Sequence, residues 1–288
     1  MKVRKAVIVA AGLGTRMLPA SKVIPKEMLP VVDTPAIQVV VEEAVAAGVE
    51  EIVMVVAPGR ATVLDQFQPA RELEQHLEKR GKRELLDSIR RTNRLARIVK
   101  AEQAEPLGLG HAVLQARAAV GNEPFAVMLP DDIFDSPRPC LRQLLDTSER
   151  ADAPVVALLR VARSEIPKYG IVEARPAGPR LFELRGLVEK PSIENAPSDL
   201  AIMGRYVLPP EIFEMLAASR PGAGGELQLT DSLMTLAQRR KLYGYEFEGV
   251  RYDLGDRVGF VTAQVGFGLK RPDLAPRLRE YLRSALKE

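Results

Sequence analysis

A loop rich in glycine and cations carries the strongest chemical signal in this chain of 288 residues. It follows a short apolar run, begins Gly12-Leu-Gly-Thr, and places Arg16, Lys22 and Lys26 downstream among three prolines. Glycine lets backbone N–H groups approach a phosphate closely, and proline stiffens the backbone between the cations. Cations held in this way neutralise charge on transferring and leaving phosphates. The loop therefore predicts a nucleotide site with phosphoryl-type transfer chemistry.

Two other kinds of phosphate loop do not fit these residues. A dinucleotide fingerprint needs a third glycine where Met17 stands, and an acidic residue near the end of the second strand, where Ala57-Pro58-Gly59 stands. A Walker loop needs a four-residue spacer between its glycines and a Lys-Ser/Thr pair, both of which are missing. A non-Walker nucleotide loop remains. The alternative, a basic loop that only caps a sheet, accounts poorly for its prolines and glycines.

The elements that position this loop follow an alternating pattern. Apolar runs at 5–10, 51–57, 97–101 and 125–129 have the length of buried strands, and stretches of helical periodicity lie between them. Alternating strands and helices predict a parallel sheet covered by helices, with ligands bound beyond the carboxyl ends of the strands. Asp131 directly follows the last of these runs, so we expect it to face the ligand.

The sequence pattern changes after a strand-like run at 154–161, where shorter candidate strands are separated by proline and glycine. We expect these pieces to form hairpins that elaborate one α/β body. The predicted strands are 170–173, 181–189 and 201–207, and the predicted helices are 209–217, 229–238 and a basic C-terminal helix at 274–285.

Composition excludes several classes of protein. The chain is 46% hydrophobic and 27% charged, and its apolar runs are far shorter than a bilayer span, so no membrane association is expected. Ten basic and five acidic residues crowd positions 71–100, but they alternate and include no aromatic residue, which indicates a solvated helical face and no nucleic-acid partner. A single cysteine, Cys140, forms no internal disulfide and favours a cytoplasmic location.

Eight sequence blocks, in order along nearly the whole chain, closely resemble the sugar-nucleotidyltransferase superfamily. Within it, the segment Ser21-Lys-x-x-Pro-Lys-Glu-Met-Leu-Pro30 and the segment Pro106-Leu-Gly-Leu-Gly-His-Ala112 resemble the bacterial UTP-glucose-1-phosphate uridylyltransferases, also called UDP-glucose pyrophosphorylases. Pro130 departs from the glycine that many relatives carry there. The blocks lie at 12–30, 105–112, 129–133, 169–173, 188–191, 204–208, 226–231 and 252–255.

The resemblance implies an α/β fold, the nucleotide-diphospho-sugar transferase fold. This is a Rossmann-like mixed, mostly parallel central sheet flanked by helices, with a small β-rich elaboration. We expect a single nucleotidyltransferase domain over 1–288. Its parts would be a nucleotide-binding half at 1–150, a sugar-binding half at 151–268 and a C-terminal helix at 269–288.

The activity that the resemblance implies is Mg²⁺-dependent transfer of UMP from UTP to glucose 1-phosphate, giving UDP-glucose and pyrophosphate without a covalent enzyme intermediate. Relatives assemble as homodimers or homotetramers, so we expect one of these states. Preference for dTTP or another hexose 1-phosphate stays open, because one methyl or one epimeric hydroxyl changes binding by only a few kcal/mol. A further alternative is a weakly active paralogue that binds a nucleotide-sugar and regulates a partner; such a protein should have lost a cation or a metal carboxylate.

The resemblance also assigns roles to individual residues. Those expected to be catalytic are Arg16, Lys26 and Asp131. Those expected to bind the nucleotide are Ala11, Gly12, Gly14, Thr15, Glu27, Gln103 and Gly108. Those expected to bind the sugar phosphate are Gly170, Glu189 and Lys190.

For the metal, the resemblance implies Asp131 and Asp253 as Mg²⁺ ligands. Mg²⁺ takes few carboxylates and many phosphate or water oxygens, so two aspartates suffice for an ion that bridges substrates. For Asp132, a role as a turn residue and a role as a metal ligand both stay open. His111 is expected to cap the helix that starts beside it, because an ionised phosphate nucleophile needs no general base.

Overall fold

The computed structural model describes residues 1–222 and 225–287, so Glu288 of the expected C-terminal helix lies outside the described residues. A large central sheet contains β1 (Lys5–Ala10), β4 (Glu51–Val56), β5 (Arg97–Glu102), β6 (Phe125–Met128), β8 (Val155–Arg160), β9 (Gly170–Gly178), β10 (Leu181–Glu189), β11 (Leu200–Leu208) and β12 (Tyr243–Glu246). Their order across the sheet is β5-β4-β1-β6-β11-β8-β12-β10-β9. The strands expected from the apolar runs are therefore present, and 170–173 and 181–189 form the predicted hairpin.

The sheet is mixed, as expected, but the further expectation that it is mostly parallel is wrong. Strands β5, β4, β1 and β6 run parallel to one another, and β12 runs parallel to β8. Strand β11 is antiparallel to both of its neighbours, and β10 is antiparallel to β12 and β9. Regular alternation of strands and helices ends after β6. Of the later strands, β9 and β10 are joined by a short connection and form an antiparallel hairpin. Strand β11 lies between β6 and β8, neither of which directly precedes it in the chain.

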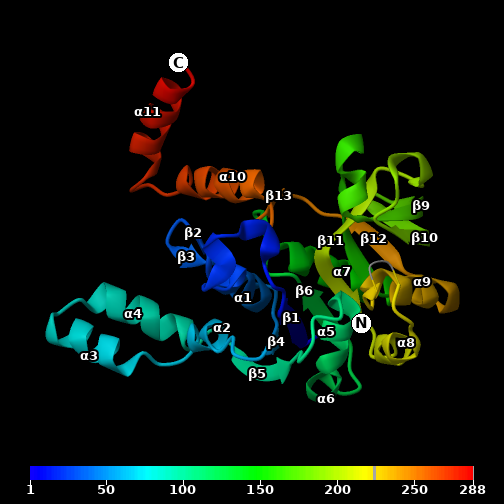
Figure 1. Ribbon diagram of the computed structural model, residues 1–288, viewed down its shortest axis with the longest axis horizontal. Helices are drawn as coiled ribbons and strands as arrows, with labels where there is room; N and C mark the ends of the chain where they lie inside the picture. The colour runs from blue at the N-terminus through cyan, green and yellow to red at the C-terminus, as the bar shows by residue number, and fades with distance from the viewer. Residues whose placement is uncertain (223–224, 288) are drawn as a thin grey trace.

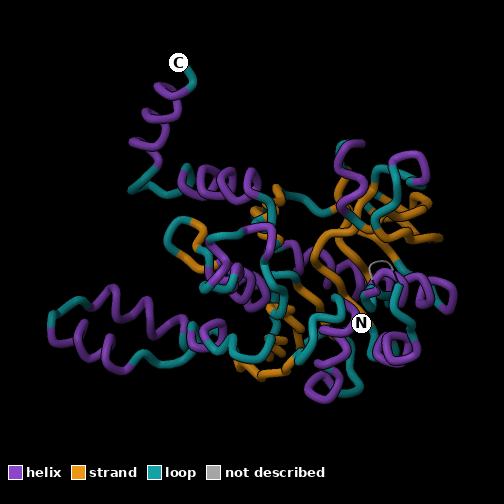
Figure 2. The backbone as a smooth tube through the Cα atoms, in the orientation of Figure 1, coloured by secondary structure: helices purple, strands orange, loops and turns teal. Residues whose placement is uncertain are grey.

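Helices cover both faces of the sheet (Figure 2). On β1, Ile8 packs into a core that includes Ile37, whereas its neighbour Val7 packs into a second core that includes Val113. Strand β1 is thus buried on both faces, as its continuous apolar sequence predicts. Among the described residues, no helix is both long and apolar enough to span a bilayer. The helices are α1 (Ala36–Ala46), α2 (Thr62–Asp65), α3 (Arg71–Lys79), α4 (Arg83–Thr92), α5 (Leu109–Gln115), α6 (Arg117–Val120), α7 (Cys140–Ala151), α8 (Ile212–Ala218), α9 (Leu229–Arg239), α10 (Arg257–Gly268) and α11 (Ala275–Ala285).

Two small antiparallel pairs were not expected from the sequence. Strands β2 (Pro30–Val31) and β3 (Thr34–Pro35) form a tight turn before α1, and β7 (Asp132–Asp135) pairs with β13 (Val250–Asp253). The second pair sets Asp253 opposite Asp132, and the Leu254 N–H donates to the Asp131 carbonyl at 2.8 Å. The pairing therefore places Asp253, far along the chain, beside the turn that follows β6.

Most of the basic stretch at 71–100 forms α3 and α4, which lie side by side and project from the sheet, and its last residues begin β5 (Figure 1). Leu77 and Leu86 are buried in this hairpin, and Arg90 Nε lies 3.1 Å from Glu74 Oε2 across it. Most of its other side chains are exposed, which confirms the predicted solvated helical surface.

Candidate active site

The glycine loop leaves β1 and folds into three short 3₁₀ turns at Thr15–Met17, Ala20–Lys22 and Lys26–Met28. Gly14 has φ +70°, a left-handed conformation that glycine adopts without strain. A Cβ there would lie 3.2 Å from the Ser21 Cβ, and the Ser21 hydroxyl donates to the Gly14 carbonyl at 2.6 Å. The loop therefore folds back tightly on itself and holds its backbone at the end of β1.

A cavity of about 430 Å³, here called the loop cavity, opens beside this loop. Gly108 closes it with φ +105°, and a Cβ at this position would lie only 2.8 Å from the Leu227 carbonyl oxygen, so only glycine fits. The Gln103 amide lies behind and donates to the Gly108 carbonyl at 3.1 Å. The residues predicted from the sequence that line this cavity are Ala11, Gly12, Gly14, Thr15, Lys26, Gln103, Gly108 and Asp131.

His111 does not cap α5, so this prediction is wrong. The N-cap position is Gly108, which has no side chain to donate or accept. The His111 ring lies between two amides instead, with Nδ1 3.1 Å from Gln103 Nε2 and Nε2 3.1 Å from Gln115 Nε2. Its role in the structure is to hold the buried Gln103 side chain beside the loop cavity.

A second cavity of about 180 Å³, here called the aspartate cavity, adjoins the first, and Asp131 lines both. It lies beyond the ends of β6 and β10 and brings together residues from both halves of the chain. The residues predicted from the sequence that line it are Arg16, Asp131, Gly170, Glu189 and Asp253.

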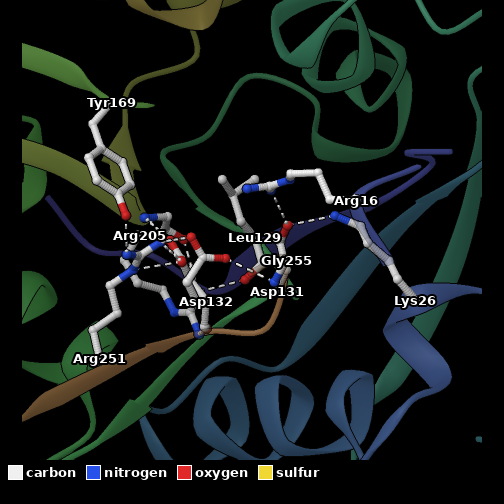
Figure 3. Close-up of polar contacts among 11 residues, drawn as sticks. Arg16, Lys26, Leu129, Asp131, Asp132, Tyr169, Arg205, Arg251 and Gly255 are labelled. Atoms are coloured by element: carbon white, nitrogen blue, oxygen red, sulfur yellow. Dashed lines mark hydrogen bonds and ion pairs between the residues drawn. The ribbon is translucent and has the colours of Figure 1, made fainter. Parts of the chain in front are cut away.

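Two cations converge on Asp131 where the cavities meet (Figure 3). Lys26 Nζ lies 2.5 Å from Asp131 Oδ2, and Arg16 Nη2 lies 3.7 Å from the same atom. Burial opposes the charge on Asp131, but attraction to Lys26, the hydrogen bond from Lys26 and attraction to Arg16 together lower the pKa of this carboxyl. Burial likewise lowers the pKa of Lys26, but attraction to Asp131 and Glu27 and the hydrogen bond to Asp131 together raise that pKa overall. Both groups are therefore charged at neutral pH.

Asp132 is bonded on both of its oxygens within the protein. The Gly204 N–H donates to Oδ2 at 2.7 Å, and Arg251 Nε donates to Oδ1 at 2.7 Å. Arg251 also donates to the Tyr169 hydroxyl at 2.9 Å and lies 3.3 Å from Asp253 Oδ2. Burial raises the pKa of Asp132 despite Arg251. Its bonds therefore favour a structural role for this carboxylate over a ligand role.

The Arg205 side chain holds the turn after β6 through hydrogen bonds to its backbone. Its fully buried guanidinium donates to the Leu129 carbonyl and to the Asp132 carbonyl, each at 2.9 Å. Glu43 on α1 supplies the counter-charge, 2.7 Å from Nη2. The ring of Phe134 stacks beneath the guanidinium carbon at 4.6 Å. This cluster fixes the backbone that presents Asp131.

Two residues predicted from the sequence lie outside both cavities. Glu27 is 1% exposed, and neither of its carboxylate oxygens has a hydrogen-bond partner among the described residues. Burial raises the pKa of this carboxyl. Lys190 is exposed, adopts φ +46°, and places Nζ 3.6 Å from Glu189 Oε1.

Sequence reasoning missed four residues that shape the site: Tyr169, Arg205, Thr230 and Arg251. Each lies inside or beside a motif block, which was the only signal available. Their partners are distant in sequence: Arg205 meets Glu43 across 162 positions. A larger groove of about 750 Å³ between α5, α6 and α8 contains none of the predicted site residues.

A glycine loop at the end of the first strand, next to cations and paired aspartates on an α/β sheet, is the arrangement of a nucleotide-dependent transferase. Comparison with known proteins agrees: a family model for nucleotidyl transferases matches residues 5–267. The chain belongs to the nucleotidyl transferase family.

Relatives of this chain are similar over nearly their whole length. The UTP–glucose-1-phosphate uridylyltransferase of Bacillus subtilis (strain 168) is 45% identical over 287 residues, covering 100% of this chain and 98% of that protein. A UDP-glucose pyrophosphorylase solved in complex with UDP-glucose is 39% identical with a TM-score of 0.86, covering 94% of this chain and 100% of that one. A UTP-bound UGPase from Acinetobacter baumannii is 37% identical with a TM-score of 0.91, covering 98% and 99%.

Proposed function

We propose that this protein transfers UMP from UTP to glucose 1-phosphate, releasing pyrophosphate and forming UDP-glucose. The observation that carries the proposal is the position of Asp131, which lines both adjoining cavities and meets Lys26 and Arg16 there. Two substrates whose phosphates meet at that point are arranged for transfer between them. The relatives with this overall fold carry the names of enzymes of this reaction.

The loop cavity would hold UTP. Backbone N–H groups near Gly12 and Gly14 suit its phosphates, and the buried Gln103 amide suits a uracil edge that offers both a donor and an acceptor. Arg16 and Lys26 would face the triphosphate where the cavities join. Leaving pyrophosphate gains negative charge during the reaction, so cations at this point stabilise the transition state.

The aspartate cavity would hold the glucose 1-phosphate. Glu189 is an acceptor for sugar hydroxyls, and the neighbouring ammonium of Lys190 would meet the phosphate. A phosphate oxygen of the sugar phosphate attacks the α-phosphorus of UTP. The bond from that phosphorus to the β-phosphate bridge breaks, and its electron pair leaves with pyrophosphate. The nucleophile is already ionised at neutral pH, so no side chain needs to remove a proton.

Asp131 and Asp253 suit a divalent cation, and we propose Mg²⁺. The β7–β13 pairing brings the two aspartates to one turn, and the described residues contain no cluster of three or more His, Cys, Asp or Glu side chains that would form a closed protein site. Few carboxylates are what Mg²⁺ takes when substrate phosphates supply its other oxygens. When bound, the ion would neutralise charge on the reacting phosphates.

Pyrophosphate release by the purified protein tests the proposal. UTP and dTTP are crossed with the 1-phosphates of glucose, galactose and N-acetylglucosamine, with Mg²⁺ and with an EDTA control. Fast release with UTP and glucose 1-phosphate alone is the expected result. Activity with another pair of nucleotide and sugar 1-phosphate would change the assigned substrates but keep the proposed transfer reaction. No release, together with measurable UDP-glucose binding, would favour a regulatory paralogue.

We also propose that the protein assembles as a homodimer or homotetramer in the cytoplasm. Helices α10 and α11 extend away from the sheet (Figure 1) and expose Val258, Val261, Tyr281 and Leu286. We take these exposed apolar side chains as the candidate contact surface, since apolar surface on a protein often marks a site that another protein covers. Light scattering of the wild type and of Val261→Asp tests this: a dimer or larger particle that the substitution dissociates is the expected outcome.

A further inference from the structure

The hydroxyl of Thr230 is bonded to the carboxylate that faces the sugar. Its Oγ1 donates to Glu189 Oε2 at 2.6 Å, a contact that joins two residues 41 positions apart. Thr230 lies in the first turn of α9, and Glu189 is the last residue of β10. Both side chains line the aspartate cavity together with Asp131 and Asp253. The hydrogen bond therefore belongs to the part of the site that the sugar would occupy.

Gly170 confines this pair from a third element, the start of β9. A Cβ at Gly170 would lie 3.1 Å from Glu189 Oε2 and 3.3 Å from Thr230 Oγ1. The other carboxylate oxygen, Oε1, lies 3.6 Å from the Lys190 ammonium. One oxygen is thus held between a hydroxyl and a glycine backbone, while the other lies near the charged end of the neighbouring lysine.

The torsion that rotates a glutamate carboxylate is broad and shows little intrinsic preference. A hydroxyl that donates to one oxygen removes this freedom and leaves the remaining acceptor positions in a fixed direction. A ligand that donates hydroxyl hydrogens then binds without first ordering the carboxylate. Hydrogen bonds to charged groups are stronger than those between neutral groups, so a carboxylate fixed in the right direction matters for binding a small sugar.

We propose that Thr230 is a positioning residue that orients the Glu189 carboxylate toward the hydroxyls of the hexose 1-phosphate. The inference rests on the proposed function and names a determinant of its sugar side. It requires the Thr230 hydroxyl and not the bulk of the side chain. It also requires no effect on the loop cavity, which Thr230 does not line.

The test compares two substitutions of similar size. Thr230→Val keeps the shape and removes the donor, whereas Thr230→Ser keeps the donor and removes a methyl group. We expect Thr230→Val to raise the KM for glucose 1-phosphate roughly tenfold, leave the KM for UTP within about twofold, and weaken UDP-glucose binding measured by calorimetry. Thr230→Ser should stay close to the wild type in all three measurements.

Thr235→Val is the matched control, because Thr235 lies in the same helix, is half-buried, and donates to the Asp231 carbonyl of its own helix at 3.2 Å. It should change none of the three constants, and thermal unfolding verifies that each variant is folded. A second check uses a Glu189→Ala background. There Thr230→Val should have no further effect on sugar binding, since the carboxylate it orients is gone.

Equal rises in both KM values, or Thr230→Ser behaving like Thr230→Val, would overturn the inference in favour of a packing role. An unchanged Thr230→Val enzyme would overturn it too, while leaving the proposed function intact. If the wild type shows no turnover, the proposed function fails, and the calorimetric comparison with UDP-glucose then decides the role of Thr230 alone. A wild type that binds no UDP-glucose would overturn both.

Discussion

The Lys26 ammonium lies 2.5 Å from Asp131 Oδ2, although the two residues are 105 positions apart. Lys26 comes from the glycine loop after β1, and Asp131 from the turn after β6, the strand that pairs with β1. The contact therefore forms where two adjacent parallel strands end. It places the cation expected to act on the phosphates against a carboxylate expected to hold the metal, at the junction of the two cavities.

This contact predicts the effect of removing the Lys26 charge. Lys26→Ala should lower kcat by roughly 10²–10³-fold, the cost of losing one charge-stabilising group in the transition state, and should change the Kd for UTP much less. Steady-state kinetics and nucleotide titration measure the two quantities. Lys22 belongs to the same cation-rich loop but is exposed and lines neither cavity, so Lys22→Ala is the control and should retain most activity. A loss confined to KM would contradict this role for Lys26.

Replacing Arg251 is expected to lower the stability of the fold. Its guanidinium is paired with the buried Asp132 carboxylate, and both side chains are less than a tenth exposed. Arg251→Ala leaves that carboxylate without its counter-charge, so we expect the free energy of unfolding to fall by about 3 kcal/mol. Urea denaturation measures it. Arg185→Ala breaks the half-exposed pair with Glu183 and should cost less than about 1 kcal/mol. Equal effects of the two substitutions would mean that Arg251 stabilises no buried charge.

Replacing the buried Glu27 is expected to raise the stability of the fold by an amount that depends on pH. Burial raises its folded-state pKa, so the folded protein binds this proton more readily than the unfolded chain does. Burying the charged form costs stability at neutral pH, and the cost falls as the pH drops through the raised folded pKa toward the ordinary carboxyl value. Glu27→Gln should therefore raise the Tm at pH 7 by a few degrees and give a smaller rise near pH 4. A lower Tm at pH 7 would show that the carboxylate is stabilised by a partner.

Asp131 and Asp132 are neighbours, but we expect Asp131 to affect activity through the metal and Asp132 to affect the stability of the fold. EDTA should abolish turnover and leave the Tm nearly unchanged, because the described residues form no closed protein cage for a metal. Asp131→Asn should abolish turnover in a way that added Mg²⁺ does not restore. Asp132→Asn should instead lower the Tm, since Asp132 is bonded to Arg251 and Gly204. Turnover that survives EDTA would contradict the proposed metal requirement.

The loop cavity could be predicted from sequence because its residues are close together along the chain. Gly12, Gly14, Thr15 and Lys26 lie on one connection, whose glycines and prolines signal an unusual backbone. The parallel strands could be predicted for a similar reason, since each is a short apolar run. In the second half the sequence also predicted strands and hairpins, but not the order in which they join the sheet, where β11 lies antiparallel to both β6 and β8.

The supporting contacts could not be predicted, because they join residues that only the fold brings together. The sequence gives no sign that Arg205 would be buried against Glu43, or that Arg251 would hold Asp132. A lone arginine beside a strand is usually exposed, and only the β7–β13 pairing turns Arg251 inward. The division into nucleotide-binding and sugar-binding halves stays a prediction.

The central claim, attack of a sugar-phosphate oxygen on the α-phosphorus of UTP, is tested most directly by following labelled oxygen. The protein is supplied with UTP, Mg²⁺ and glucose 1-phosphate that carries oxygen-18 at its phosphate, and the products are examined by phosphorus NMR and mass spectrometry. We predict that all of the label appears in the β-phosphate group of UDP-glucose, including its bridge to the α-phosphorus, and none in pyrophosphate. Label in pyrophosphate, or the absence of UDP-glucose, would contradict the account.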